Sequence, residues 1–220
     1  MRNTWRVCRW VLLLVLILGS GGIFGCAFQD RHVTLTPPTT ILHTSSVSST
    51  SPDGKTISVA RPQDLRPNPT IIGNVSANSY GMVTAQVYSN TDIPAWVANS
   101  IIQGLERSGF RVERAETVEA APTPVALDIA VSRVFTEHFP GLFRFTGKGD
   151  VVAQVEVYKD GRRVLRRTYS GRSEETKMVT TNSASEYQGL LDSAMKNFLN
   201  KAMPDLVRVL DRVLEESSRG

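Results

Sequence analysis

Apolar positions between residues 93 and 108 repeat about every four residues, the period of one face of a helix. The repeating positions are Ile93, Val97, Ile101 and Leu105. Pro94 stands in the first turn, where its missing N–H costs no hydrogen bond, and Gly109 follows the last turn, where a left-handed cap is common. The pattern therefore predicts one short helix.

A second helical pattern opens at Ser183, which precedes Glu186 at the spacing of a capping box. Its apolar side carries Tyr187, Leu190, Leu191, Ala194, Phe198 and Ala202. Pro204 lacks the N–H that a helix interior needs, so the sequence predicts a kink or a break there, followed by a second helical segment over 205–216.

Large apolar residues at every second position, Val125, Leu127, Ile129 and Val131, predict a half-buried strand over 125–135. Residues 142–158 and 162–173 are predicted to form a long hairpin around Asp160-Gly161, a strong turn dipeptide. Shorter extended segments are predicted at 56–60, at 71–75, at 80–88 and from Phe110 onward, with an irregular proline-containing loop over 61–69. These elements predict an α+β fold: a single mixed or antiparallel sheet with one short helix and a long C-terminal helix packed on it.

Residues 1–25 have the pattern of a secretory signal peptide. Three arginines precede the nine-residue apolar run 10–18, and small residues follow it. A spanning helix needs about 20 apolar residues, so this run alone is too short. Because no charged residue stands between Arg9 and Asp30, an uncleaved membrane anchor remains an alternative, and an ordinary secreted protein is another.

The run Ile23-Phe24-Gly25-Cys26 resembles a bacterial lipobox. The resemblance implies that the Cys26 thiol receives a diacylglycerol and that Cys26, once N-acylated, becomes the first residue of the mature chain. No other cofactor is expected, and the lipid would join the protein to a membrane. By the sorting rule of enteric lipoproteins, Ala27 in place of Asp implies the periplasmic face of the outer membrane, with the inner membrane as the alternative.

Residues 34–53 are dominated by polar and proline residues, since 14 of the 20 are Ser, Thr or Pro. Such a composition cannot bury a core. Residues 26–55 are therefore predicted to be the lipidated N-terminus and a tether, and residues 56–220 a periplasmic domain. A short strand around His32 to Leu35, joining the sheet at its edge, is the alternative for part of this stretch.

The formal charge of +4 for 220 residues invites a nucleic-acid interpretation, but the excess lies in the signal peptide. Without residues 1–25 the chain carries 22 basic and 21 acidic residues. Charge balance and export together predict no nucleic-acid partner. The two cysteines, Cys8 and Cys26, are too few for a disulfide framework or a four-cysteine zinc site.

A series of short motifs resembles the YajG-type family of bacterial lipoproteins. After the lipobox come a strand ending in Ala60, Asp64-Leu65-Arg66, Ile72-Gly73, a helix, and Ser108-Gly109-Phe110. The resemblance covers residues 26–215 in order. It implies an envelope lipoprotein with a fold similar to auxiliary lipoproteins of transport systems, and it implies no enzymatic activity.

The candidate site residues are few. Asp64 and Arg66 have two interpretations: they bind a partner together, or they form a local ion pair that fixes the 61–69 loop. The other candidate is a cluster of four arginines in the predicted hairpin, which would contact an anionic partner: Arg162, Arg163, Arg166 and Arg167. Strand alternation would place Arg163 and Arg167 on one face, and Arg162 and Arg166 on the other. The alternative for this cluster is a solvated edge whose charges prevent aggregation.

No catalytic or metal-binding motif is recognised, so the sequence predicts a protein that is not an enzyme. The predicted role is binding or scaffolding in the envelope, with an envelope protein, a lipid or the cell wall as partner. One alternative is a hydrolase acting on the cell wall, which would need a cleft with convergent carboxylates of perturbed pKa. Two further alternatives remain. An auxiliary component of a transport system would need an apolar groove for lipid or another amphipathic substrate. A second docking surface is the helix beyond Pro204.

Overall fold

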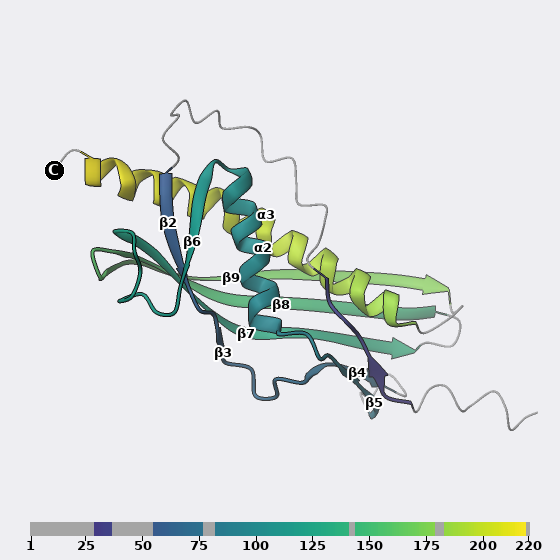
Figure 1. The fold of residues 1–220 in the computed structure, drawn as a ribbon. Helices are drawn as coiled ribbons and strands as arrows, with labels where there is room; N and C mark the ends of the chain where they lie inside the picture. Colours follow the sequence, from purple (N-terminus) through teal and green to yellow (C-terminus); the bar gives the residue numbers. More distant parts are fainter. Residues whose placement is uncertain (1–28, 37–54, 77–81, 141–143, 179–182, 219–220) are drawn as a thin grey trace, which may run out of the picture.

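The computed structural model describes residues 29–36, 55–76, 82–140, 144–178 and 183–218. The strands are β1 (Arg31–His32), β2 (Lys55–Ala60), β3 (Gln63–Asp64), β4 (Ile71–Ser76), β5 (Val83–Tyr88), β6 (Phe110–Ala115), β7 (Val125–Pro140), β8 (Arg144–Lys159) and β9 (Arg162–Met178). The helices in this part of the chain are α2 (Ile93–Arg107) and α3 (Ala184–Ser218). They pack on one mixed sheet, which confirms the predicted α+β class (Figure 1).

The sheet is organised around β7. Along one side of β7, the strands β2, β3 and β4 follow one another, each parallel to it. Along the other side, β8 pairs antiparallel with β7 over its whole length, and β9 extends the hairpin. The residues of the 61–69 loop therefore include a strand, β3, which bridges β2 and β4.

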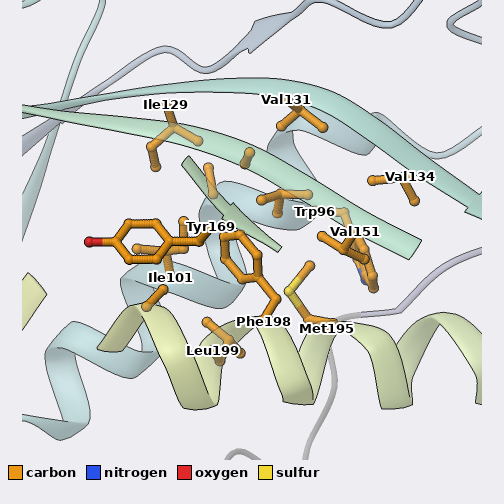
Figure 2. Close-up of a cluster of buried hydrophobic side chains, with 14 of the residues drawn as sticks. Trp96, Ile101, Ile129, Val131, Val134, Val151, Tyr169, Met195, Phe198 and Leu199 are labelled. Atoms are coloured by element: carbon orange, nitrogen blue, oxygen red, sulfur yellow. The ribbon is translucent and has the colours of Figure 1, made fainter. Parts of the chain in front are cut away.

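Both helices cover the same face of this sheet, and the core lies between them and the strands (Figure 1). Figure 2 shows Trp96 and Ile101 of α2 and Met195, Phe198 and Leu199 of α3 meeting the inward side chains of the strands. All six of the apolar positions predicted for the C-terminal helix are buried. Among the described residues, neither helix is long and apolar enough to cross a membrane.

Of the two outcomes predicted at Pro204, a kink or a break of the C-terminal helix, the break does not occur. A single helix, α3, runs from Ala184 to Ser218 with Pro204 inside it. Met203 and Leu206 are buried on either side of the proline, and Met203 packs against Gly104 of α2. Packing on both sides thus holds the helix continuous where local propensity disfavours it.

Close approach of α3 to the sheet depends on glycine. A Cβ added at Gly171 of β9 would overlap the Ala194 carbonyl oxygen and the Phe198 nitrogen of the helix. At Gly149 of β8 it would lie 2.8 Å from the Leu190 carbonyl oxygen. The backbones of helix and strands therefore pack directly against each other at these positions.

The folded domain includes residues from the stretch where the sequence predicts a tether. Arg31 and His32 pair in parallel with β5 at the edge of the sheet, and Val33 and Leu35 are buried. The indole N–H of Trp96 donates to the Thr36 carbonyl oxygen at 2.8 Å. Residues 37–54 lie outside the described residues, but the chain on both sides of them belongs to this one sheet. Residues 1–25, predicted to be a signal peptide, and Cys26 also lie outside the described residues.

Candidate functional site

The face of the sheet opposite the helices is covered by neither of them, and polar side chains project from it. On β8 the buried Val151, Ala153, Val155 and Val157 point toward the helices, so the residues between them point the other way. We call this surface the open face. On β7, β8 and β9 it consists of Asp128, Arg133, Phe135, Asp150, Gln154, Glu156, Tyr158, Arg163, Arg166 and Arg172.

Glu156 is the centre of one half of the open face. Its side chain accepts hydrogen bonds from the Tyr158 hydroxyl at 2.6 Å and from the Gln154 amide at 3.0 Å. Arg163 and Arg166 form ion pairs with it at 3.3 and 3.2 Å. The Tyr158 hydrogen bond and the two guanidinium groups hold the pKa of Glu156 below its usual value.

Asp128 lies beside this cluster on β7, directly opposite Glu156 in the register. Burial, together with the charge of Glu156, raises the pKa of Asp128. The Gln63 amide donates to its carboxylate at 3.2 Å. The two neighbouring carboxylates therefore have pKa values shifted in opposite directions, and the arginines are bound to Glu156, whose pKa is lowered.

Arg133 links the other half of the open face. Its guanidinium lies 3.5 Å from Asp150 and 3.7 Å from Glu137, and 4.8 Å from the centre of the Phe135 ring. Arg172 pairs with Asp150 from β9 at 3.1 Å. Charges on this surface therefore alternate in sign and mostly neutralise one another.

A cavity of about 310 Å³ adjoins Arg133, between β4, β5, β7 and the loop after β3. Its polar lining comes from Arg66, Asn68, Asn74, Gln86, Ser132 and Arg133, and its apolar lining from Pro67, Ile71, Val134 and Phe135. Amide and guanidinium groups beside an aromatic ring suit a small polar or anionic group.

Asp64 and Arg66 are brought together and fix one wall of this cavity. The guanidinium donates to both carboxylate oxygens of Asp64, from Nε at 2.9 Å and from Nη2 at 2.8 Å. Nη2 also donates to the Pro69 carbonyl oxygen at 2.7 Å. The Arg66 side chain is only 4% exposed, and its hydrogen bonds lower the pKa of Asp64. The pair thus holds the loop between β3 and β4 in place.

The structure distributes the hairpin arginines differently from simple alternation. A register irregularity between Val157 and Tyr158 places Arg163 on the open face together with Arg166, and both contact Glu156. Arg167 points to the helix side and pairs with Asp205 of α3, which also accepts a hydrogen bond from the Tyr169 hydroxyl at 2.6 Å. Arg162 lies exposed at the start of β9. A β-bulge shifts the side-chain alternation by one residue, which is the reason for the difference.

Sequence reasoning missed Glu156 and the cavity. The alternation of polar residues along 148–158 signals an outward face, but nothing local identifies which acidic residue the arginines reach. Among the described residues, no group of three or more His, Cys, Asp or Glu side chains is arranged to hold a metal ion. His32 stacks on Tyr88, and His138 is enclosed in the core.

Comparison with known proteins identifies a family. A family model described as "Uncharacterized lipoprotein" matches residues 44–206. No curated protein matches the sequence.

Among solved structures, protein XCC0632 from Xanthomonas campestris is similar in fold. It has a TM-score of 0.51 and 15% identity, over 87% of this chain and all of that one. Lipoprotein GNA1162 from Neisseria meningitidis has a TM-score of 0.37 and 16% identity, over 67% of this chain and 99% of that one. A minor lipoprotein from Acinetobacter baumannii has a TM-score of 0.40 and 9% identity, over 70% and 93%.

Proposed function

Because this chain belongs to a family of uncharacterized lipoproteins, we propose that it is a lipid-anchored envelope protein with a non-enzymatic binding or scaffolding role in the periplasm. Membership of the family implies lipid modification and attachment to a membrane of the envelope. The finer assignments are part of the proposal: acylation at Cys26, kinship with YajG-type lipoproteins, and residence on the periplasmic face of the outer membrane.

The open face and its cavity are the observation that carries the binding role. Neither helix covers this side of the sheet, and the cavity of about 310 Å³ presents amide and guanidinium donors beside the Phe135 ring. Such a surface can bind a polar or anionic group of an envelope partner by hydrogen bonds and charge. Arg133 and Gln86 are the side chains we assign to this contact.

Internal pairing of the charged groups favours binding over catalysis. The Tyr158 hydrogen bond and two arginines lower the pKa of Glu156, and Asp150 forms ion pairs with Arg133 and Arg172. A general acid or base needs a free proton position facing a substrate. Charged groups that are bound to one another instead form a surface with a fixed pattern of potential, which suits recognition of a complementary partner.

The small size of the cavity and the filled core also favour this role over the carriage of lipid. A lipid carrier needs a deep apolar groove. The cavity beside Arg133 has a mixed lining and a volume of only about 310 Å³, and the apolar residues of α2 and α3 are occupied in the core. We therefore keep transport of an amphipathic substrate as the second candidate only.

Photo-crosslinking in living cells tests the binding role. A photoreactive residue replaces Gln86 in the cavity, and in a separate variant it replaces Arg208 on α3 as the matched control. We expect Gln86 to capture an envelope protein, lipid or wall fragment that Arg208 does not. Identical products at both positions, or none at Gln86, would contradict the proposal. Products at Arg208 alone would support docking on the helix beyond Pro204.

Intact-mass analysis of the membrane fraction tests the anchor separately. The mature chain should begin at Cys26 and carry the mass of its acyl chains. A Cys26→Ser variant should lose this mass and leave the membrane fraction. A Cys26→Ser protein that is still acylated would show that lipid is attached elsewhere.

A further inference from the structure

The folded domain begins very close to the proposed lipid attachment. The Asp30 carboxylate accepts a hydrogen bond from the Gln86 backbone N–H at 2.8 Å, and Arg31 and His32 then pair with β5. Asp30 is therefore attached to the edge of the sheet, and it stands four residues after Cys26. Four residues span at most about 14 Å, so the part of the domain around Asp30 cannot lie far from the acyl chains.

Strand directions show which end of the molecule this is. β1 runs parallel to β5, with Arg31 opposite Val87 and Asp30 bound to Gln86, so Asp30 lies on the Val83 side of β1. Val83 pairs with Ser76 at the end of β4. The residue before Ser76, Val75, begins a row of paired residues that crosses the sheet through His138 and Gly147 to Glu175. The end of the molecule at Val83, on the right in Figure 1, therefore also holds the end of β7, the start of β8, the end of β9 and the start of α3.

Apolar side chains are exposed at this end. Met82 is 60% exposed, Val83 48% and Met178 75%. Among the described residues only five large apolar side chains are this exposed, and these are three of them. Arg144, which pairs with Met178 in the register, and Lys177 add basic groups beside them. We call Met82, Val83, Arg144, Lys177 and Met178 the anchor end.

Charge at the anchor end is close to balanced, because Lys177 pairs with Glu175 at 3.0 Å and Lys148 with Glu174 at 3.9 Å. A balanced charge with exposed apolar side chains and peripheral basic groups fits the headgroup region of a bilayer. The short connection to Cys26 selects the occupant, since the bilayer holding the acyl chains is the surface that this end must approach.

We propose that the anchor end docks on the membrane that holds the lipid, with Met82, Val83 and Met178 in the headgroup region. The inference rests on the proposed acylation of Cys26. Docking at this end directs β8 and β9 away from the bilayer, so the Asp160-Gly161 turn points into the periplasm. The open face then stands along the membrane normal, where a partner can reach its whole length.

Site-specific labelling of the acylated protein tests this orientation. The mature chain has no cysteine other than Cys26, so a thiol introduced elsewhere is unique once Cys26 carries lipid. Val83→Cys and Val164→Cys form a matched pair, because each valine is 48% exposed. Val164 lies near the hairpin turn, 14 residues or about 46 Å along β9 from Met178. Met178→Cys is the third variant.

Each variant is labelled with a fluorophore and reconstituted into phosphatidylethanolamine–phosphatidylglycerol vesicles that contain a headgroup quencher. We expect severalfold stronger quenching at residues 83 and 178 than at residue 164. Equal quenching at all three positions, in protein that floats with the vesicles, would overturn the docking proposal and leave the lipid anchor intact. A protein that carries no acyl mass and does not float would overturn both.

Discussion

His138 is a titratable side chain enclosed at the end of β7. It is 1% exposed, its ring stacks on Tyr187 at 4.1 Å, and Phe145 lies 5.0 Å away on another side. Neither ring nitrogen has a hydrogen-bond partner among the described residues. Burial therefore lowers the pKa of His138 to about 4, and the ring is neutral in the folded protein.

This environment predicts a loss of stability in mild acid. The unfolded state binds a proton at a pKa near 6.5 and the folded state only at about 4. Above pH 6.5 the ring is neutral in both states, so its titration costs the folded protein no stability. Between these two pKa values only the unfolded state is protonated, so the free energy of unfolding falls as the pH drops, by about 2 kcal/mol at pH 5. Urea titrations at pH 7 and pH 5 should show this loss. His138→Phe should remove most of the difference, whereas His32→Gln should retain it.

Asp64 and Arg66 predict a second effect at the residue scale. Because Arg66 is almost fully buried, Asp64→Asn leaves its charge without a counter-charge and should lower the free energy of unfolding by about 2 kcal/mol. The lowered pKa of Asp64 means that the wild-type pair is lost only as the pH falls below about 4. Glu116→Gln is the control, since Glu116 pairs with Arg61 at 4.0 Å with both side chains about 80% exposed. An equal loss in both variants would refute this role of burial.

At the scale of elements, the contact between α3 and the β8–β9 hairpin holds the domain together. Gly149 and Gly171 remove the side chains that would separate helix and strands, and Tyr169 and Phe198 then meet edge to face at 6.3 Å. Arg167 and Asp205 close the outer side of the same contact. This packing also explains why α3 continues through Pro204, because apolar contacts on both sides outweigh one lost backbone hydrogen bond.

Two glycine substitutions test this contact. Gly171→Ala places a Cβ against the backbone of α3, so the helix must move, and unfolding should become easier by about 1–3 kcal/mol or more. Gly189 lies within α3 with open space around it, so Gly189→Ala should stabilise the protein by up to about 1 kcal/mol. Thermal unfolding of both variants distinguishes the effects. A stabilised Gly171→Ala variant would show that helix and strand are not in direct backbone contact.

Over the described residues the domain is a one-sided sheet: α2 and α3 cover one face, and the other carries the polar open face. Residues 29–36 fold onto the edge of this sheet, so the polar stretch 37–54 connects two strands of one domain. Only a few residues then remain between Cys26 and the fold. This arrangement is the basis for the proposed docking of the anchor end.

Membrane choice is predicted at the same scale. If Ala27 after the acylated cysteine directs the chain to the outer membrane, Ala27→Asp should retain it in the inner membrane. Separation of the two membranes on a density gradient, followed by immunoblotting, measures the shift. Ala27→Ser should leave the distribution unchanged. Wild-type protein found in the inner membrane would contradict the outer-membrane assignment.

The sequence by itself determined the features that depend on near neighbours. Four-residue periodicity located α2 and the buried side of α3, and the Asp160-Gly161 turn has the positive φ angles, 49° and 73°, that its residue types favour. The cluster of arginines was visible as composition, and the resemblance of residues 23–26 to a lipobox as a short motif.

Only the tertiary structure decided which distant residues meet. The choice of β7 as the central strand, the bulge that places Arg163 beside Arg166, and their binding to Glu156 all depend on strand pairing. The continuity of α3 through Pro204 and the docking of residues 31–35 likewise depend on contacts far apart in sequence. Local propensities act within a few residues, whereas these outcomes depend on the free energy of burial and pairing summed over the whole fold.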